Sequence, residues 1–387
     1  MKRSECSTIT TIVAPPPAGG LTAWLQVVCM RFVFFNTWGI SNGSLSSNNF
    51  TQKNNHRPPL RYPGSESAQA SLLFFLGVFA GRATDAGYFC VVYLAGASLQ
   101  VLGFFMLFLC KNYWQIFLAQ AVFMGLGNGL TFSPGRHDVL FFSRHHAVAV
   151  VGAATPVMLV SQIPGLTLFK PCFSTHTSSP APLIDSTAFK EPSFMFFTPS
   201  MFLNFWGLYF AFFYMGTFAR DRIGVPDTQN LILILNGVGV IGRIVPGLIG
   251  NRITGKLNIL IPLSFASAII ICAWIAVDAV GGLYVFTVIY GFVGGAAQSL
   301  FPATATTMTQ DIRRTGTRIV MILSFVGFAT LTGPAIDGAL IQRMGGRYTG
   351  AQVFAGSVIF LGACAAVAGG SERLRFKLYC VFCPWWK

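Results

Sequence analysis

Long apolar runs, separated by short polar segments, dominate the chain. The first run, residues 21–40, has about 20 residues, which is enough for a helix to cross the hydrocarbon core of a bilayer. The further runs predicted as spanning helices are 69–84, 88–110, 114–134, 146–169, 200–219, 229–250, 257–277, 282–303, 317–340 and 351–369. Because a helix satisfies its own backbone hydrogen bonds in lipid, this pattern predicts an all-α integral membrane protein.

Composition supports the same class of protein. Hydrophobic residues make up 53% of the chain and charged residues only 10%, whereas soluble domains carry about a quarter charged residues. The net charge of +14 could indicate a nucleic-acid partner, but the basic residues are scattered between apolar runs and form no continuous face. The bias of Lys and Arg toward cytosolic loops explains them better. The expected partner is therefore the lipid bilayer, and no nucleic acid is expected.

The polar segments divide the chain into five parts. These are a cytosolic tail (1–18), a first, incomplete helical bundle (19–169), a central loop rich in Pro, Ser and Thr (170–199), a six-helix bundle (200–370) and a cytosolic basic tail (371–387). The two bundles echo one another, because 166 positions separate Gly81 from Gly247 and also Gly125 from Gly291, each pair within a similar motif. Duplicated halves are the organisation of many secondary transporters.

The number of crossings is left open by the sequence. Lys and Arg counts place both ends of the chain in the cytosol, which requires an even number of crossings, but eleven apolar runs are found. Two glycosylation sequons, at Asn42 and Asn49, favour a luminal or extracellular loop at 41–68. Either residues 146–199 contain an irregular sixth crossing, or the chain is a shortened relative with damaged function.

One charge lies deep inside an apolar run, in the stretch 231–255. On a helix Arg243 shares a stripe with Asn236, Gly239 and Gly250, because their spacings are three, four and seven. Small residues on both sides of the arginine let another helix pack close while the guanidinium faces a protein-lined cavity. An ionisable group at that depth is by default functional. The alternative is an arginine that snorkels or pairs with a helix-end carbonyl.

Several motifs together resemble the major facilitator superfamily, specifically its fungal monocarboxylate-transporter-like branch. Gly81–Asp85 resembles the signature of the loop between the second and third spans, and 141–149 resembles an aromatic and basic signature that enters the fifth span. The entry at 19–24 and the run 36–39 resemble the first-span signature. The resemblance implies a two-bundle transporter fold with about 11–12 transmembrane helices.

The resemblance also implies a conformational latch made by Gly81, Asp85 and Arg144. In the family an acidic side chain at this helix end interacts with a neighbouring helix N-terminus and with basic partners. Such a contact is physically reasonable, since a helix N-terminus attracts negative charge. The second half has Asn251 where the first has Asp85, so the matching latch loses its charge.

The implied mechanism is alternating access around a cavity near the membrane midplane. Arg243 would anchor a substrate carboxylate, because its guanidinium can bind one bidentately. Candidate polar groups of the cavity are Asn36, Trp38, Asn236 and Gln298. The alternative for these residues is hydrogen bonding between helices of the bundle.

Two tyrosines and two aspartates have weaker assignments. Tyr209 and Tyr214 either line the cavity or pack in the bundle. The family implies proton coupling, but Asp278 and Asp337 are expected near helix ends and Asp85 belongs to the latch. No coupling residue is therefore assigned.

The sequence favours a transporter over an enzyme. It contains no phosphate-binding loop and no nucleophile elbow, which disfavours an ATP-driven pump or a membrane hydrolase. His137, His145 and His146 are expected in a solvated loop, so neither a metal ion nor another cofactor is expected.

The leading hypothesis is a proton-linked or facilitative carrier of a small organic anion of the monocarboxylate type. The alternatives are efflux or uptake of a secondary metabolite or vitamin, and a transport-incompetent relative. The plasma membrane is the favoured location, with the vacuole or another endomembrane as the alternative.

Overall fold

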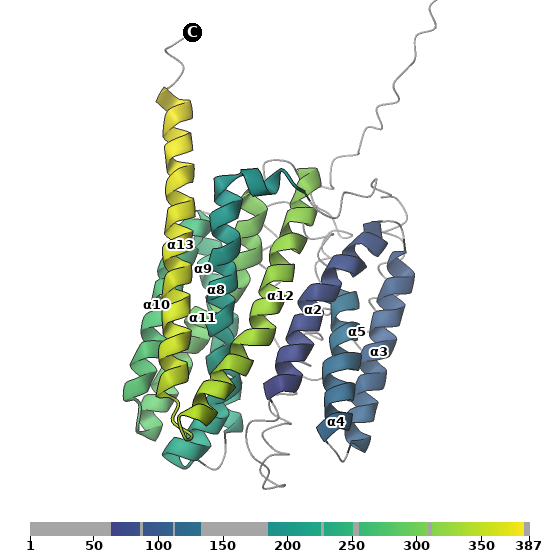
Figure 1. Cartoon of the computed structure of the whole chain (residues 1–387), viewed down its shortest axis with the longest axis vertical. Helices are drawn as coiled ribbons and strands as arrows, with labels where there is room; N and C mark the ends of the chain where they lie inside the picture. Colours follow the sequence, from purple (N-terminus) through teal and green to yellow (C-terminus); the bar gives the residue numbers. More distant parts are fainter. Residues whose placement is uncertain are drawn as a thin grey trace, which may run out of the picture.

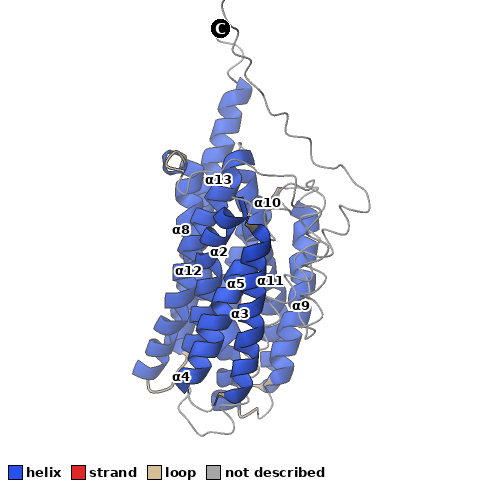
Figure 2. Cartoon of the chain, turned by 90° about the vertical axis from the view of Figure 1, so that its right-hand side faces the viewer, coloured by secondary structure: helices blue, strands red, loops and turns tan. Residues whose placement is uncertain are grey.

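The computed structural model describes residues 63–85, 88–110, 113–132, 185–225, 228–250, 255–308 and 312–382. Within these ranges the ordered elements are all helices, which run roughly side by side along one axis (Figure 1, Figure 2). The expectation of an all-α protein is therefore confirmed. Residues 133–184 lie outside the described ranges, so the irregular crossing expected within 146–199 stays a prediction.

The first half contributes α2 (Pro63–Asp85), α3 (Phe89–Leu109) and a third, segmented helix. That third helix consists of α4 (Tyr113–Ile116), the π-helical η2 (Phe117–Met124) and α5 (Gly125–Phe132). Glycines of α5 bring it close to its neighbours. A Cβ at Gly129 would meet Leu76 and the backbone of α2, and one at Gly127 would meet Gln100 and the backbone of α3.

The second half contains the six helices that are long and apolar enough, among the described residues, to cross a membrane. They are α8 (Pro192–Phe218, continued by η5, Ala219–Ile223), α9 (Gln229–Ile249), α10 (Lys256–Ala273, continued by η7, Trp274–Ala276), α11 (Val280–Met308), α12 (Ile312–Arg343) and α13 (Thr349–Phe382). Gly345 and Gly346, with φ of 64° and 86°, make the turn between α12 and α13.

Several helices extend beyond their predicted spans, and α2, α8 and α13 extend furthest. Helix α8 begins inside the predicted central loop, where Pro192 stands at its start with the φ angle that a helix needs. Phe194 and Phe197 follow and are buried, so apolar packing extends the helix into a segment whose composition indicates a loop. Helix α13 continues into the predicted tail, and α2 starts at Pro63 rather than at 69.

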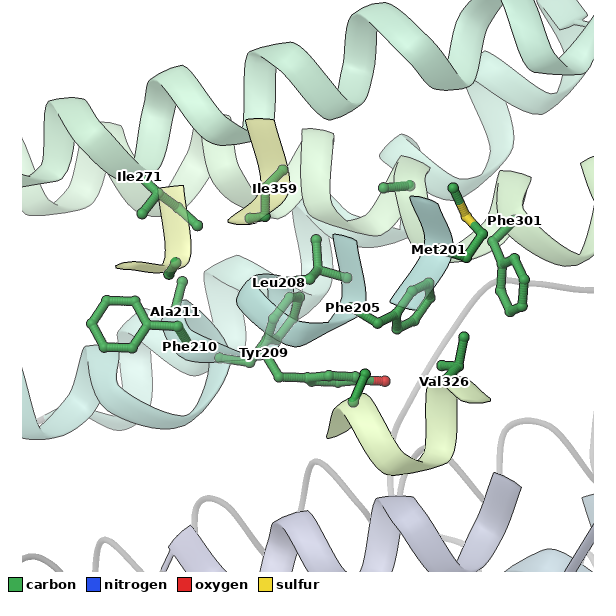
Figure 3. Close-up of a cluster of buried hydrophobic side chains, with 14 of the residues drawn as sticks. Met201, Phe205, Leu208, Tyr209, Phe210, Ala211, Ile271, Phe301, Val326 and Ile359 are labelled. Carbon is green, nitrogen blue, oxygen red and sulfur yellow. The ribbon is translucent and has the colours of Figure 1, made fainter. Parts of the chain in front are cut away.

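The core of the second half surrounds α8. Met201, Phe205 and Leu208 of α8 lie among side chains from the four helices around them (Figure 3). Those partners are Ile271 of α10, Phe301 of α11, Val326 of α12 and Ile359 of α13. Because α8 is apolar on all sides, it suits the centre of the bundle rather than its surface.

Helix α2 joins the two halves by packing along α12 (Figure 1). The rings of Phe75 and Phe328 lie 6.1 Å apart, and those of Phe74 and Phe205 lie 6.5 Å apart. The start of α2 and the end of α12 lie at the same end of the molecule, the lower end in Figure 1. The six successive helices of the second half place the start of α8 and the end of α13 at the opposite end.

The predicted duplication appears as repeated contacts. A Cβ at Gly125 would lie 3.2 Å from the Cα of Gln69, and one at Gly291 would lie 3.2 Å from the Cα of Leu235. Gln69 and Leu235 are themselves 166 positions apart. The same offset therefore relates both members of a close helix–helix contact.

Candidate functional site

Arg243 lies on α9 at its closest approach to α11. A Cβ at Gly295 would lie 2.7 Å from the carbonyl oxygen of Gly239, and one at Gly242 would collide with the carbonyl group of Phe292. The two backbones can approach this closely only because these positions carry no side chain. The predicted packing of small residues around the arginine is therefore present.

The guanidinium of Arg243 has a neutral partner on α11. Its Nη2 donates a hydrogen bond of 3.1 Å to Oε1 of Gln298. The next residue, Ser299, donates from its hydroxyl to the backbone carbonyl of Arg243 at 3.2 Å. Within the described ranges, no carboxylate forms an ion pair with Arg243. In this part of the chain the half-buried cation is therefore satisfied by a neutral amide alone.

Polar atoms near this arginine are buried and have no hydrogen-bond partner among the described residues. They include Nε2 of Gln298 and the hydroxyl of Tyr209, which interacts electrostatically with Arg243. Oδ1 of Asn236, on the same face of α9, is also without a partner, although its Nδ2 donates to the carbonyl of Ile232 at 3.0 Å. Buried polar groups normally find partners, so this cluster has capacity for a polar ligand.

The offset of 166 shows that the cation belongs to one half only. Position 77, the equivalent of 243 in α2, is a buried glycine. At this pair of equivalent positions the two halves therefore share their packing and differ in charge.

The other predicted site residues have different outcomes. Asn36, Trp38 and Arg144 lie outside the described residues. Gly81 is buried in α2, and Asp85 is the last residue of that helix. The three-residue latch therefore stays a prediction. Tyr214 lies in α8, where its hydroxyl donates to the carbonyl of Pro334 at 2.8 Å.

The expectation that Asp337 lies near a helix end is wrong. Asp337 is inside α12 with no exposed surface, whereas Asp278 is exposed in the turn before α11. The predicted span 317–340 ends three residues after Asp337, but α12 continues to Arg343 and the surrounding helices bury the side chain completely.

Sequence analysis also missed an ion cluster before α8. Arg318 of α12 donates from Nε to Oδ2 of Asp185 at 2.9 Å and forms two further hydrogen bonds, of 2.7 and 2.6 Å, with the carboxylate of Glu191. Burial raises the pKa of Asp185, but hydrogen bonds from Thr187 and Arg318 outweigh it, so the pKa is lower than usual. Asp185 and Glu191, two acidic residues close together before α8, were the signal in the sequence that could have indicated this cluster.

Comparisons with known proteins place these features in context. No family model matches the chain. An MFS-type transporter of Gibberella zeae is 35% identical over 400 aligned positions that cover 95% of this chain and 90% of that protein. The aspyridones efflux protein apdF of Emericella nidulans is 27% identical, over an alignment that covers 96% of this chain and 84% of that protein.

A solved structure shares the fold. The crystal structure of the human organic anion transporter MFSD10 superposes with a TM-score of 0.60 and covers 89% of this chain and 98% of that chain. The sequences are only 10% identical, so this likeness concerns the fold alone.

Proposed function

The chain belongs to the major facilitator superfamily and is a multi-pass membrane transporter rather than an enzyme, and from this premise we propose that it exports an organic anion of the secondary-metabolite class. Export is suggested by relatives such as apdF, whose name states efflux of aspyridones. An anionic cargo is suggested by Arg243. We propose the plasma membrane as its location.

The uncompensated charge of Arg243 is the observation that carries this proposal. Among the described residues, only a neutral amide oxygen, that of Gln298, accepts from the guanidinium. A carboxylate or an acidic enol could replace that weak bond by a bidentate, charge-assisted pair. The free amide of Gln298 and the hydroxyl of Tyr209 would supply further donors. Asn236 would add a polar group on the same stripe.

A monocarboxylate, the substrate class that the sequence resemblance implies, would bind to the same anchor, Arg243. The two substrate classes differ in size rather than in the charge that Arg243 recognises. Proton linkage is proposed for both, because export against a gradient requires a driving ion. A chain that folds but transports nothing is the remaining alternative.

The test is transport by the purified full chain in vesicles. A panel should contain a short monocarboxylate, an aromatic polyketide-type acid and the neutral methyl ester of that acid. We expect transport of the aromatic acid and no transport of its ester. Loss of one charged partner costs about 2–5 kcal/mol, so R243A should weaken the affinity for the acid by about 30-fold or more.

Two control variants make the result specific. R243K keeps the charge but loses the bidentate geometry, so it should transport with intermediate affinity. R222A removes an exposed arginine at the end of α8 and should leave transport unchanged. Equal affinity for the acid in wild type and R243A would refute the anchor. Transport of the short acid alone would favour the monocarboxylate class.

A further inference from the structure

The side-chain amide of Asn236 has one end that is used and one that is not. Its Nδ2 donates a hydrogen bond of 3.0 Å to the backbone carbonyl of Ile232. Because a carbonyl can only accept, this bond fixes which end of the amide is the nitrogen. The other end, Oδ1, is buried and has no hydrogen-bond partner among the described residues. Asn236 therefore presents an acceptor that nothing in the described part of the chain uses.

The hydrogen bond of Asn236 does not join two helices. Asn236 and Ile232 both belong to α9, so the bond from Nδ2 closes within a single helix. Within the described ranges, the predicted alternative of a hydrogen bond between helices is therefore not made by this side chain. A buried acceptor without a donor lowers stability, and such an atom calls for an explanation.

The amide of Asn236 lies beside the guanidinium of Arg243. The arginine side chain folds back along α9, because its Nη1 would lie 3.4 Å from a Cβ at Gly239, about one turn earlier. Asn236 precedes Gly239 by three residues, and Cβ positions three apart on a helix are about 5–6 Å from one another. The amide and the guanidinium are therefore neighbours on one side of α9.

The other polar groups near Arg243 can donate hydrogen bonds. Gln298 uses its Oε1 to accept from Arg243 at 3.1 Å, so its unpartnered end, Nε2, is a donor. The phenol of Tyr209, which interacts electrostatically with Arg243, has a buried hydroxyl without a partner among the described residues. These groups suit an anion, whereas Oδ1 of Asn236 requires a ligand atom that carries a proton.

A ligand that is only an anion would therefore leave Asn236 unsatisfied. A carboxylate has no proton to donate, and its negative charge near Oδ1 would be repelled. A hydroxyl or N–H group next to the acid group would instead supply the missing donor. Sites built to bond a ligand hydroxyl discriminate strongly against analogues that lack it, because their own polar groups then stay unpaired.

We propose that Asn236 determines specificity by selecting anions that carry a neutral hydroxyl or N–H donor close to the acid group. Arg243 and Gln298 bind the acid group, and Oδ1 of Asn236 accepts from the neutral donor. This narrows the cargo from organic anions in general to hydroxylated or amino-substituted acids. The inference rests on the proposed function, because it takes Arg243 as the anchor.

Equilibrium binding to the purified full chain tests this selection without transport. The probes are meta- and para-hydroxybenzoate and the corresponding methylbenzoates, which have the same charge and nearly the same size but no donor. At pH 7 all four are carboxylates, and the hydroxyl groups keep their protons. At least one hydroxy acid should bind the wild type about fivefold or more tightly than its methyl counterpart. The aminobenzoate with the same substitution pattern should share this advantage.

Variants of two asparagines assign the preference to its residue. N236L keeps the approximate size of the side chain and removes the oxygen, so it should abolish the difference while still binding the methyl acid. N236A serves the same purpose if N236L does not fold. N258L changes an exposed asparagine of α10 and should keep the difference.

The outcomes separate this inference from the proposed function. Equal affinities of the hydroxy and methyl acids in the wild type, or an unchanged preference in N236L, would overturn the selection by Asn236. If binding then still depended on Arg243, the anchor would stand. Equal binding of these acids by wild type and R243A would instead count against the proposed function. Absence of binding at millimolar concentration would overturn both.

Discussion

Two arginines of the second half differ in how their charges are satisfied. Arg318 is 5% exposed and is held by two carboxylates, whereas Arg243 has one neutral amide as its partner. Both lie on apolar helices of one bundle. The difference indicates that Arg318 holds the start of α8 against α12, and it agrees with the proposed role of Arg243 as an anion anchor.

R318A tests the structural role of Arg318, and we expect it to cause the largest loss of stability. It leaves Asp185 buried without its cation, and loss of one partner of a buried pair costs about 3–5 kcal/mol. The change should appear as a lower midpoint of detergent-induced unfolding. R343A, which removes an exposed arginine, is the matched control. A change in R318A no larger than that of R343A would contradict the structural role.

A second variant disturbs the surroundings of Arg243 without removing its charge. G242A places a methyl group against the backbone of Phe292, which cannot move aside as a flexible side chain could. Overpacking of this kind costs about 1–3 kcal/mol and should also separate Arg243 from Gln298.

G237A on the same helix is the control for that variant, because a Cβ there meets nothing within 4 Å. G237A should be neutral or slightly stabilising, since alanine favours a helix over glycine. Thermal unfolding and anion affinity should both fall in G242A only. Equal behaviour of the two variants would show that close α9–α11 packing is unimportant.

A third variant, R243L, should separate stability from function. It removes a charge that lacks a compensating anion, so the free energy of unfolding should stay unchanged or rise by about 1 kcal/mol. Anion transport should be lost. A destabilisation as large as that of R318A would mean that Arg243 is a structural residue.

The smallest expected effect is the pH dependence of the stability that Asp185 contributes. Because the pKa of Asp185 is lowered in the folded protein, its ion pair stabilises fully above the unfolded value of about 4 and is lost as pH falls through the folded value. The stability difference between wild type and D185N should therefore be constant from about pH 5 to 7 and shrink below about pH 4. Thermal unfolding at several pH values measures it.

The sequence predicted the parts of this molecule that depend on local pattern. Long apolar runs indicated the helices, and the spacing of Gly239 and Arg243 indicated a small-residue face around a charge. It failed for Asp337, because the predicted span ends three residues after it, whereas α12 continues to Arg343 and packing of the neighbouring helices buries the side chain. It also failed for residues 192–199, which were predicted as a loop but form the start of α8, because their apolar side chains pack against the neighbouring helices.

The membrane class, the duplicated halves and the placement of Arg243 on a stripe with Asn236 were thus determined by the sequence itself, because bilayer thickness and helix periodicity translate directly into residue spacing. Only the tertiary structure decided which charges are paired. Asp185 and Arg318 are 133 positions apart, and neither carboxylate oxygen of Asp337 has a hydrogen-bond partner among the described residues. Partners that distant are chosen by how helices pack, which no local pattern encodes.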